Sequence, residues 1–322
     1  MIFNRSVSLL VIFYILLYVP HISEAQSFQL NDHPNWLIPA DTLHQPRFIF
    51  LSSSVITVYG ITLYGLDKLW YADYPKGKFR WADDSKEWLQ VDKAGHMVTS
   101  YLEAYYLTQM LRWSGVEQKK AAIYGGLTAF IFQNTIEVFD GFSDLWGASV
   151  SDIAANFLGA ALMTTQELVW EEQRIKLKLL PVFTHFSDPE LRTRSEQLYG
   201  NSLLQRSLKD YNSIHVWMSI NPASLTGKNG KFSWLNIAIG YGAGGMFGGY
   251  DNIWTDADGI IHDRTDIVRY RKFMLSLDVD LSRVKTKSRY LRQVLDLVNI
   301  IKVPFPTIEW NTKGELRVHP LY

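Results

Sequence analysis

The sequence predicts an α+β fold, in which an N-terminal, membrane-associated α-helical bundle is followed by a mostly antiparallel β domain. Two observations lead to this prediction. Residues 47–180 contain long apolar stretches with helical periodicity, whereas the apolar residues of 212–322 alternate with polar ones. Between them, 181–211 is polar and has the pattern of one short helix at 188–199, so we interpret it as a linker.

Composition limits the class of protein. The 322 residues are enough for two domains, each with its own core. The 32 basic and 32 acidic side chains balance, so no long-range attraction to nucleic acid is expected. The sequence contains no cysteine, which excludes disulfides, thiolate metal sites, a cysteine nucleophile and a lipid-anchored N-terminal cysteine. Its 11 tryptophans suit a large core or a membrane–water interface.

The first 25 residues have the pattern of a signal peptide. Arg5 supplies the positive charge, residues 9–19 form the apolar segment, and small residues precede a cleavage site before Gln26. The alternative is an uncleaved membrane anchor, and both interpretations predict export. Residues 26–46 are polar and contain three prolines, which predicts an irregular lead-in.

The helical region begins with an uncharged stretch. Phe48–Leu66 contains nineteen residues without a charge and is followed by Asp67, Lys68 and aromatic residues. This pattern predicts a helix that spans or enters a membrane, with a buried helix of a soluble protein as the alternative. Three further helices are expected at about Glu87–Trp113, Glu117–Phe139 and Ser149–Lys178.

The β domain is predicted from alternation. In Phe273–Leu281 apolar residues occupy every second position, which indicates a half-buried antiparallel strand. Ile214–Ile220 and Leu235–Tyr241 alternate in the same way. A hairpin is expected to pair Thr307–Trp310 with Glu315–His319, and Ser288–Lys302 has the pattern of one amphipathic helix.

Polar residues recur at helical spacing on the three helices that follow the uncharged stretch. If these helices pack side by side, the polar stripes converge on one pocket. A buried ionisable group is costly unless it is paired or used, so we take such a cluster as the candidate site. The stripes are Asp92, His96, Thr99 and Glu103; Gln133, Glu137 and Asp140; and Ser149, Asp152 and Asn156, followed by Gly159.

This set of side chains leaves several roles open. Asp92, His96, Glu137, Asp140, Asp152 and Asn156 are the candidate ligand-binding residues. His96, Asp92 and Glu137 are the catalytic candidates, with His96 as acid or base and Asp92 orienting its ring. Oxygen ligands of this kind also suit a hard divalent cation, although we assign no metal and expect no cofactor. The remaining alternative is a hydrogen-bonded network that fixes the helix register.

The motif Asp-Lys-x-x-His, a later helix ending near a Glu, and Ser-x-x-Asp-x-x-x-Asn-x-x-Gly resembles the VanZ-like family of bacterial membrane proteins. The pieces here are Asp92–His96, Glu137–Ser143 and Ser149–Gly159. The chain more closely resembles a related, uncharacterised family of predicted periplasmic or envelope proteins. The resemblance implies a cell-envelope role, but it implies no particular activity. VanZ-like proteins usually have a Gly-Arg pair where this chain has Gly147-Ala148, so a natural partner for an anionic ligand is missing.

These observations predict an exported cell-envelope protein, periplasmic and membrane-associated, whose polar pocket binds a lipid head group or envelope component or acts structurally. One alternative is an envelope hydrolase or transferase that acts on a lipid-linked or peptidoglycan-related substrate, with His96 as acid or base. Another is a docking module that the helices anchor to the membrane. The expected partners are the membrane and a lipid or envelope protein.

Overall fold

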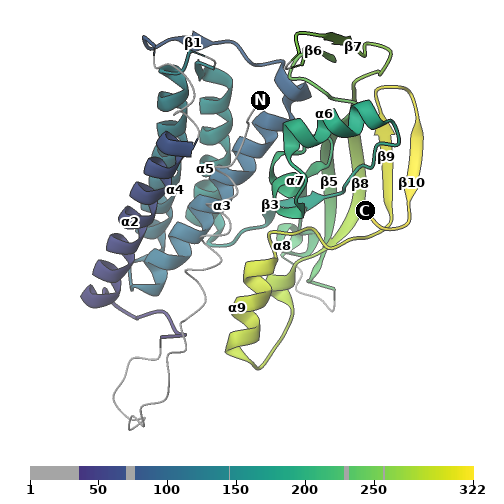
Figure 1. The fold of residues 1–322 in the computed structure, drawn as a ribbon. Coiled ribbons are helices and arrows are strands. Elements are labelled where there is room, and N and C mark those ends of the chain that lie inside the picture. Colours follow the sequence, from purple (N-terminus) through teal and green to yellow (C-terminus); the bar gives the residue numbers. More distant parts are fainter. Residues whose placement is uncertain (1–35, 70–76, 145, 228–231, 257) are drawn as a thin grey trace, which may run out of the picture.

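The computed structural model describes residues 36–69, 77–144, 146–227, 232–256 and 258–322. The predicted signal peptide at 1–25 lies outside the described residues. A helical bundle occupies one side of the molecule and an antiparallel sheet the other (Figure 1). The mixed α+β prediction is therefore confirmed. The bundle consists of α2 (Gln45–Leu69), α3 (Val91–Trp113), α4 (Gln118–Gly141) and α5 (Val150–Trp170).

α3 is the central helix, and it packs against both α4 and α5. Its buried residues Val98, Tyr101 and Leu107 form the main core together with Ala129 of α4 and Met163 of α5. The backbones of α3 and α5 approach closely at Gly159, where an added Cβ would lie 2.0 Å from the carbonyl oxygen of Met97. The small residues that the sequence places on these helices therefore allow close packing.

α2 lies at the edge of the bundle. Its Tyr59 ring stacks on Phe132 of α4, with ring centroids 3.8 Å apart. Most of the helix is nevertheless uncovered, because only 11% of its most apolar stretch is buried. Among the described residues, α2 is the one helix that is long and apolar enough to cross a membrane, over Gln45–Gly65.

The entry into α3 is an irregular turn. β1 (Trp81–Ala82) pairs in parallel with β2 (Ala148–Ser149), and the short 3-10 turn η1 (Glu87–Gln90) follows. Trp88, Leu89 and Gln90 all have left-handed backbone conformations, with φ of 48°, 50° and 63°. A regular helix cannot pass through three such residues. The helix expected from about Glu87 therefore begins at Val91.

The main sheet has six strands in the order β10-β9-β8-β5-β4-β3, and every neighbouring pair is antiparallel. Its strands confirm the predicted strands and the predicted hairpin. Their bounds are β3 (Ile175–Pro181), β4 (Ile214–Ile220), β5 (Leu235–Gly244), β8 (Tyr270–Val279), β9 (Thr307–Asn311) and β10 (Leu316–His319).

Shorter elements cover the ends of the sheet. The region predicted as a linker contains two helices, of which the first matches the expected one. The amphipathic helix expected at Ser288–Lys302 is shorter than predicted and projects from the lower end of the molecule in Figure 1. These elements are α6 (Pro189–Tyr199), α7 (Leu203–Lys209), α8 (Pro222–Thr226), β6 (Ile253–Thr255), β7 (Ile261–Asp263), η2 (Leu281–Arg283) and α9 (Arg289–Val298).

The third predicted helix is wrong at its C-terminal end. α5 stops at Trp170, where Glu171 adopts a left-handed conformation with φ of 56°. The next residues form strand β3, in which Lys178 is fully buried against Asp278 of β8 at 2.7 Å. The alternation of Lys and Leu in this segment has a period of two, so tertiary pairing favours a strand over a helix.

The sheet is half-buried, as alternation predicts, but the buried side of β8 is the polar one. Leu275 and Leu277 are 51% and 41% exposed, whereas Ser276 and Asp278 are 6% and 0% exposed. This polarity is the reverse of the usual arrangement in an antiparallel sheet that faces water.

Candidate functional site

Three helix ends meet at one end of the bundle, and His96 lies between them. Its Nδ1 is 3.1 Å from Oδ1 of Asn156 on α5. Its Nε2 is 3.9 Å from a carboxylate oxygen of Glu137 on α4 and 3.9 Å from one of Asp152 on α5. The predicted convergence of the three polar stripes is therefore present in the structure. Asn156, rather than Asp92, holds Nδ1 of the ring.

Lys93 is surrounded by carboxylates. Its Nζ lies 2.5 Å from Asp84, 3.1 Å from Asp92 and 2.9 Å from Asp152. Neither Lys93 nor Asp84 was among the predicted site residues. Lys93 belongs to the sequence motif but lies beside the helical stripe, whereas Asp84 comes from the loop after β1. The parallel pairing of β1 with β2 brings that loop to the start of α5.

The N-terminus of α5 is capped within the cluster. The Ser149 hydroxyl accepts a hydrogen bond from the backbone N–H of Asp152 at 3.0 Å and donates one to Asp84 at 2.5 Å. Ser151 donates to the same Asp84 oxygen at 2.9 Å. The backbone N–H of Ser149 donates to Glu137 at 3.2 Å. The predicted stripe residue Ser149 thus acts as an N-cap that links α4, α5 and the β1 loop.

Two further predicted residues, Asp92 and Asp140, lie at the edge of the cluster. Asp92 is buried and accepts a hydrogen bond from the Tyr211 hydroxyl at 2.8 Å, which ties α3 to the segment before β4. Asp140 lies half-buried near the end of α4, and its negative charge contributes to the raised pKa of Glu137. Tyr211 stacks on the buried Trp88 ring, with centroids 5.0 Å apart. Sequence periodicity gave no signal for Tyr211, because it contacts the cluster from a distant element.

The charges of the cluster determine its protonation. Burial alone would lower the pKa of His96, but the negative charges of Asp152, Asp92 and Glu137 outweigh it and raise the pKa to about 9. Burial raises the pKa of Glu137 to about 8, against the opposing effect of the imidazolium. Near pH 7, His96 is therefore charged and Glu137 is mostly protonated. Lys93 stays charged because Asp92 and Asp152 raise its pKa despite burial.

One buried polar atom beside His96 is unsatisfied, and a second is paired only through an ammonium group. Nδ2 of Asn156 makes no hydrogen bond within the described part of the chain, and Oδ1 of Asp152 contacts the Lys93 ammonium group at 2.9 Å. Asp152 is 3% exposed and Asn156 is fully buried. At 3.9 Å, Nε2 of His96 is also too far from either carboxylate for a direct hydrogen bond. Nε2 of His96 and Nδ2 of Asn156 therefore have hydrogen-bonding capacity left for a further polar group.

A metal ion is a second possible occupant. Asp92, His96 and Asp152 each have a donor atom within 4.8 Å of the others, close enough to hold a cation. The ammonium group of Lys93 already supplies a positive charge to both carboxylates, at 3.1 and 2.9 Å. Its repulsion of a second cation makes the residues a poor fit to a resident metal.

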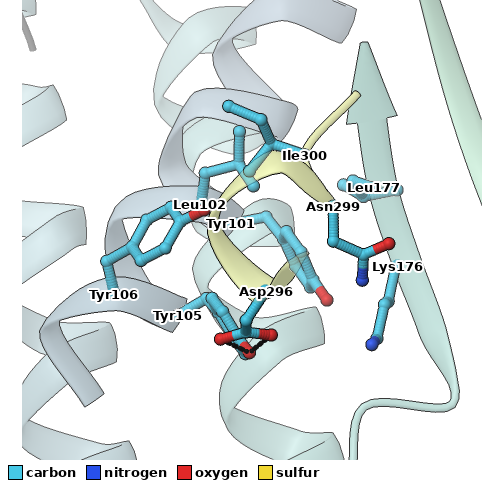
Figure 2. Close-up of a pocket in the computed structure, with 9 residues that line it drawn as sticks. All are labelled: Tyr101, Leu102, Tyr105, Tyr106, Lys176, Leu177, Asp296, Asn299 and Ile300. Atoms are coloured by element: carbon cyan, nitrogen blue, oxygen red, sulfur yellow. Dashed lines mark hydrogen bonds between the residues drawn. The ribbon is translucent and has the colours of Figure 1, made fainter. Parts of the chain in front are cut away.

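A separate cleft lies between α3 and the C-terminal region (Figure 2). The Tyr105 hydroxyl donates to both carboxylate oxygens of Asp296, at 2.9 and 3.0 Å. The Tyr106 hydroxyl donates to the carbonyl oxygen of Leu297 at 3.2 Å. The cavity of about 20 Å³ has room for about one water molecule. This cleft therefore attaches α9 to the bundle and is too small for a larger ligand.

Comparison with known proteins gives one match. Residues 79–167 match a family described as "Predicted periplasmic lipoprotein (DUF2279)", and this segment contains most of the cluster. No curated protein and no solved structure matches the chain. The family description names a lipoprotein, whereas these 322 residues contain no cysteine to carry a lipid. The match supports an uncharacterised periplasmic family, and the chain is an exported, envelope-associated protein.

Proposed function

We propose that this protein is inserted in an envelope membrane and that its acid–imidazole–lysine cluster binds the polar head group of a phospholipid. The observation that carries the proposal is the hydrogen-bonding capacity left at His96: Nε2 lies 3.9 Å from Glu137 and from Asp152, too far for a hydrogen bond, and Nδ2 of Asn156 makes none within the described part of the chain. The side chains of His96, Lys93 and Asp84 are 16%, 11% and 15% exposed, so the cluster reaches the surface.

Membrane insertion is supported by uncharged belts on three helices. The sequence has no charge from Phe48 to Leu66, none between Lys120 and Glu137, and none between Asp152 and Glu167. The exposed side chains within the α4 and α5 belts are apolar apart from one threonine: Ile123, Tyr124, Leu127 and Ile131 on α4, and Ala154, Phe157, Leu158 and Thr165 on α5. An apolar surface of this kind is typical of contact with lipid.

The cluster lies where these belts end. Sixteen uncharged residues on α4 give a belt of about 24 Å, a little less than the ~30 Å of a hydrocarbon core. A membrane adapts to a short belt by thinning, which brings the charged ends to the level of the head groups. Glu137 and Asp152 border the belts directly, so the cluster would lie at head-group depth.

The charges favour a zwitterionic head group. Lys93 and His96 can face a phosphate, while Asp84, whose side chain is the most exposed of the three carboxylates beside Lys93, can face an ammonium group. The N-terminus of α5 belongs to the same cluster, and the positive end of its helix dipole also favours a phosphate. Phosphatidylethanolamine carries both groups and is the ligand we commit to.

Native mass spectrometry of the full chain in detergent tests this proposal. Phosphatidylethanolamine, phosphatidylglycerol and phosphatidylcholine are titrated separately into the wild type, His96→Gln and Asp152→Asn. We expect preferential retention of phosphatidylethanolamine by the wild type and its loss in both variants, with unchanged circular dichroism. His262→Gln is the matched control, because His262 also contacts two carboxylates but lies on the separate β6–β7 hairpin. Equal retention of all three lipids, or loss only together with unfolding, would contradict head-group binding.

An envelope hydrolase or transferase is the second candidate, and one observation favours it. A pKa of about 9 keeps His96 protonated at neutral pH, as a general acid that protonates a leaving-group oxygen requires. The same titration separates the two functions, because recovery of intact lipid supports binding and a cleaved fragment that disappears in His96→Gln supports hydrolysis.

The relation to VanZ-like proteins is also a proposal. It is supported by the fact that His96, Asp152 and Asn156, which carry the resemblance, meet in one cluster.

A further inference from the structure

One face of the main sheet is apolar and uncovered across four strands. Nine large apolar side chains on this face are between 41% and 70% exposed, counted over the described residues. They line up across β5, β8, β9 and β10, because the register pairs Ile239 with Leu275 and Leu275 with Ile308. The nine are Ile237, Ile239, Phe273, Leu275, Leu277, Ile308, Trp310, Leu316 and Val318. We call them the apolar sheet face.

The opposite face is buried and carries paired charges beside the apolar side chains of Trp217, Ala238 and Met274. Lys178 and Asp278 form an ion pair at 2.7 Å, and both side chains are 0% exposed. Lys178 also donates to Oδ1 of Asn299 at 2.8 Å, and Asp278 accepts from Ser219 at 2.6 Å. Lys302 lies 4.6 Å from the centre of the Trp217 ring and donates to a carbonyl oxygen at 2.8 Å. The Lys178–Asp278 charges are therefore paired inside, whereas Nδ1 of His215 and Nε1 of Trp217 make no hydrogen bond within the described part of the chain.

The apolar sheet face continues into the bundle. Val216 and Met218 of β4 belong to the same face and pack against the core around α3. Their register partners on β5 are Tyr241 and Ile239, and the exposed part of the face begins there. The helices thus cover the face at one end and leave it open at the other.

We propose that the apolar sheet face contacts the acyl chains of the same bilayer that surrounds the helical belts. The chain is envelope-associated, and the face is continuous with the bundle that we place in the membrane. Protein interfaces carry about one hydrogen bond per 100–200 Å² and have a polar rim, whereas the exposed members of this face are all apolar. A polar interior with an apolar exterior is the arrangement of β-structure in contact with lipid.

This inference deepens the proposed membrane location, and the absence of cysteine makes it directly testable. Single cysteines replace Leu275 or Ile308 on the apolar sheet face, Ile56 on α2, or Ile261 on the β6–β7 hairpin. Each full-length variant is labelled with the environment-sensitive dye NBD and reconstituted in vesicles of phosphatidylethanolamine and phosphatidylglycerol. Ile261 is the matched control because it is an exposed aliphatic strand residue outside the main sheet, 71% exposed.

We expect a blue-shifted NBD emission at Leu275→Cys and Ile308→Cys, with quenching by doxyl-labelled lipid as strong as at Ile56→Cys. Ile261→Cys should be quenched instead by iodide in the buffer. Quenching at Ile56→Cys without quenching at the sheet positions would overturn this inference but leave the proposed insertion intact. Absence of lipid quenching at all positions would overturn both. Blue-shifted emission without lipid quenching, together with disulfide-linked dimers of unlabelled Leu275→Cys after oxidation, would assign the face to a second copy of the chain.

Discussion

The charge on His96 should make the stability of the bundle depend on pH, and the replacement His96→Gln should remove that contribution. In the folded protein the pKa rises from 6.5 to about 9, against the opposing effect of burial, because Asp152, Asp92 and Glu137 surround the ring. A rise of this size corresponds to at most about 3 kcal/mol of preference for the charged ring in the folded state. The side chain is only 16% exposed, so solvent screens little of this interaction.

The direction of the pH dependence of stability follows from the direction of the pKa shift of His96. A group whose pKa is higher in the folded state contributes its full stability below the unfolded pKa, here about 6.5, and loses it as the pH rises through about 9. The difference in unfolding free energy between the wild type and His96→Gln should therefore be largest near pH 6. It should shrink to the packing difference alone above pH 9.

Thermal unfolding of the detergent-solubilised full chain, followed by circular dichroism from pH 5.5 to 10, measures this difference. We expect the melting temperature of His96→Gln to fall several degrees below that of the wild type at pH 6, and this difference to narrow to the packing difference alone at pH 10. His262→Gln is the control, since its ion pairs with Glu190 and Asp256 are partly exposed and contribute little. If the difference in melting temperature between the wild type and His96→Gln stays constant from pH 5.5 to 10, the charge on the imidazole does not stabilise the bundle.

Two further predictions concern packing. Gly159→Ala should destabilise the bundle by about 1–3 kcal/mol, because its Cβ would meet the Met97 carbonyl at 2.0 Å, whereas Gly95→Ala, with nothing within 4 Å, should stabilise α3 by up to about 1 kcal/mol. Equal melting temperatures for the two variants would show that α3 and α5 are not in close contact. Lys178→Met should cost about 3–5 kcal/mol because it leaves Asp278 unpaired, and the double variant with Asp278→Leu should recover much of the loss. Chemical denaturation measures these changes in unfolding free energy. If the losses of the two single variants simply add in the double variant, the pairing of Lys178 with Asp278 is refuted.

The helical part of the site could be predicted because its information is local. Period 3.6 places Asp92 and His96 on one face, and the same spacing on α5 places Asp152 and Asn156 on another. Two apolar helices that must bury a face then bring these residues together. Asp84 could not be predicted in the same way. It reaches the cluster only because the two-residue pairing of β1 with β2 fixes its loop, and such a short pairing leaves no periodic pattern.

Alternation gave the strands of the sheet but not which face is buried. A period of two separates Leu275 and Leu277 from Ser276 and Asp278, and it is unchanged when inside and outside are exchanged. The choice depends on what lies against each face. Here the polar face meets Lys178 of β3, a residue that helical periodicity had assigned to a helix. Because the segment of Lys178 was predicted to be helical, the buried partner of the polar face of β8 could not be predicted either.

In both the bundle and the sheet, charged side chains are paired in the interior while part of the apolar surface remains exposed. In water this arrangement is unfavourable, because burying Lys178 and Asp278 costs solvation while Leu275 and Trp310 remain exposed. In a bilayer the balance is reversed, since lipid solvates the apolar exterior and polar groups must be satisfied internally. The proposed membrane location therefore explains both the cluster around His96 and the inverted sheet. A soluble envelope protein would need a separate partner to cover each apolar surface.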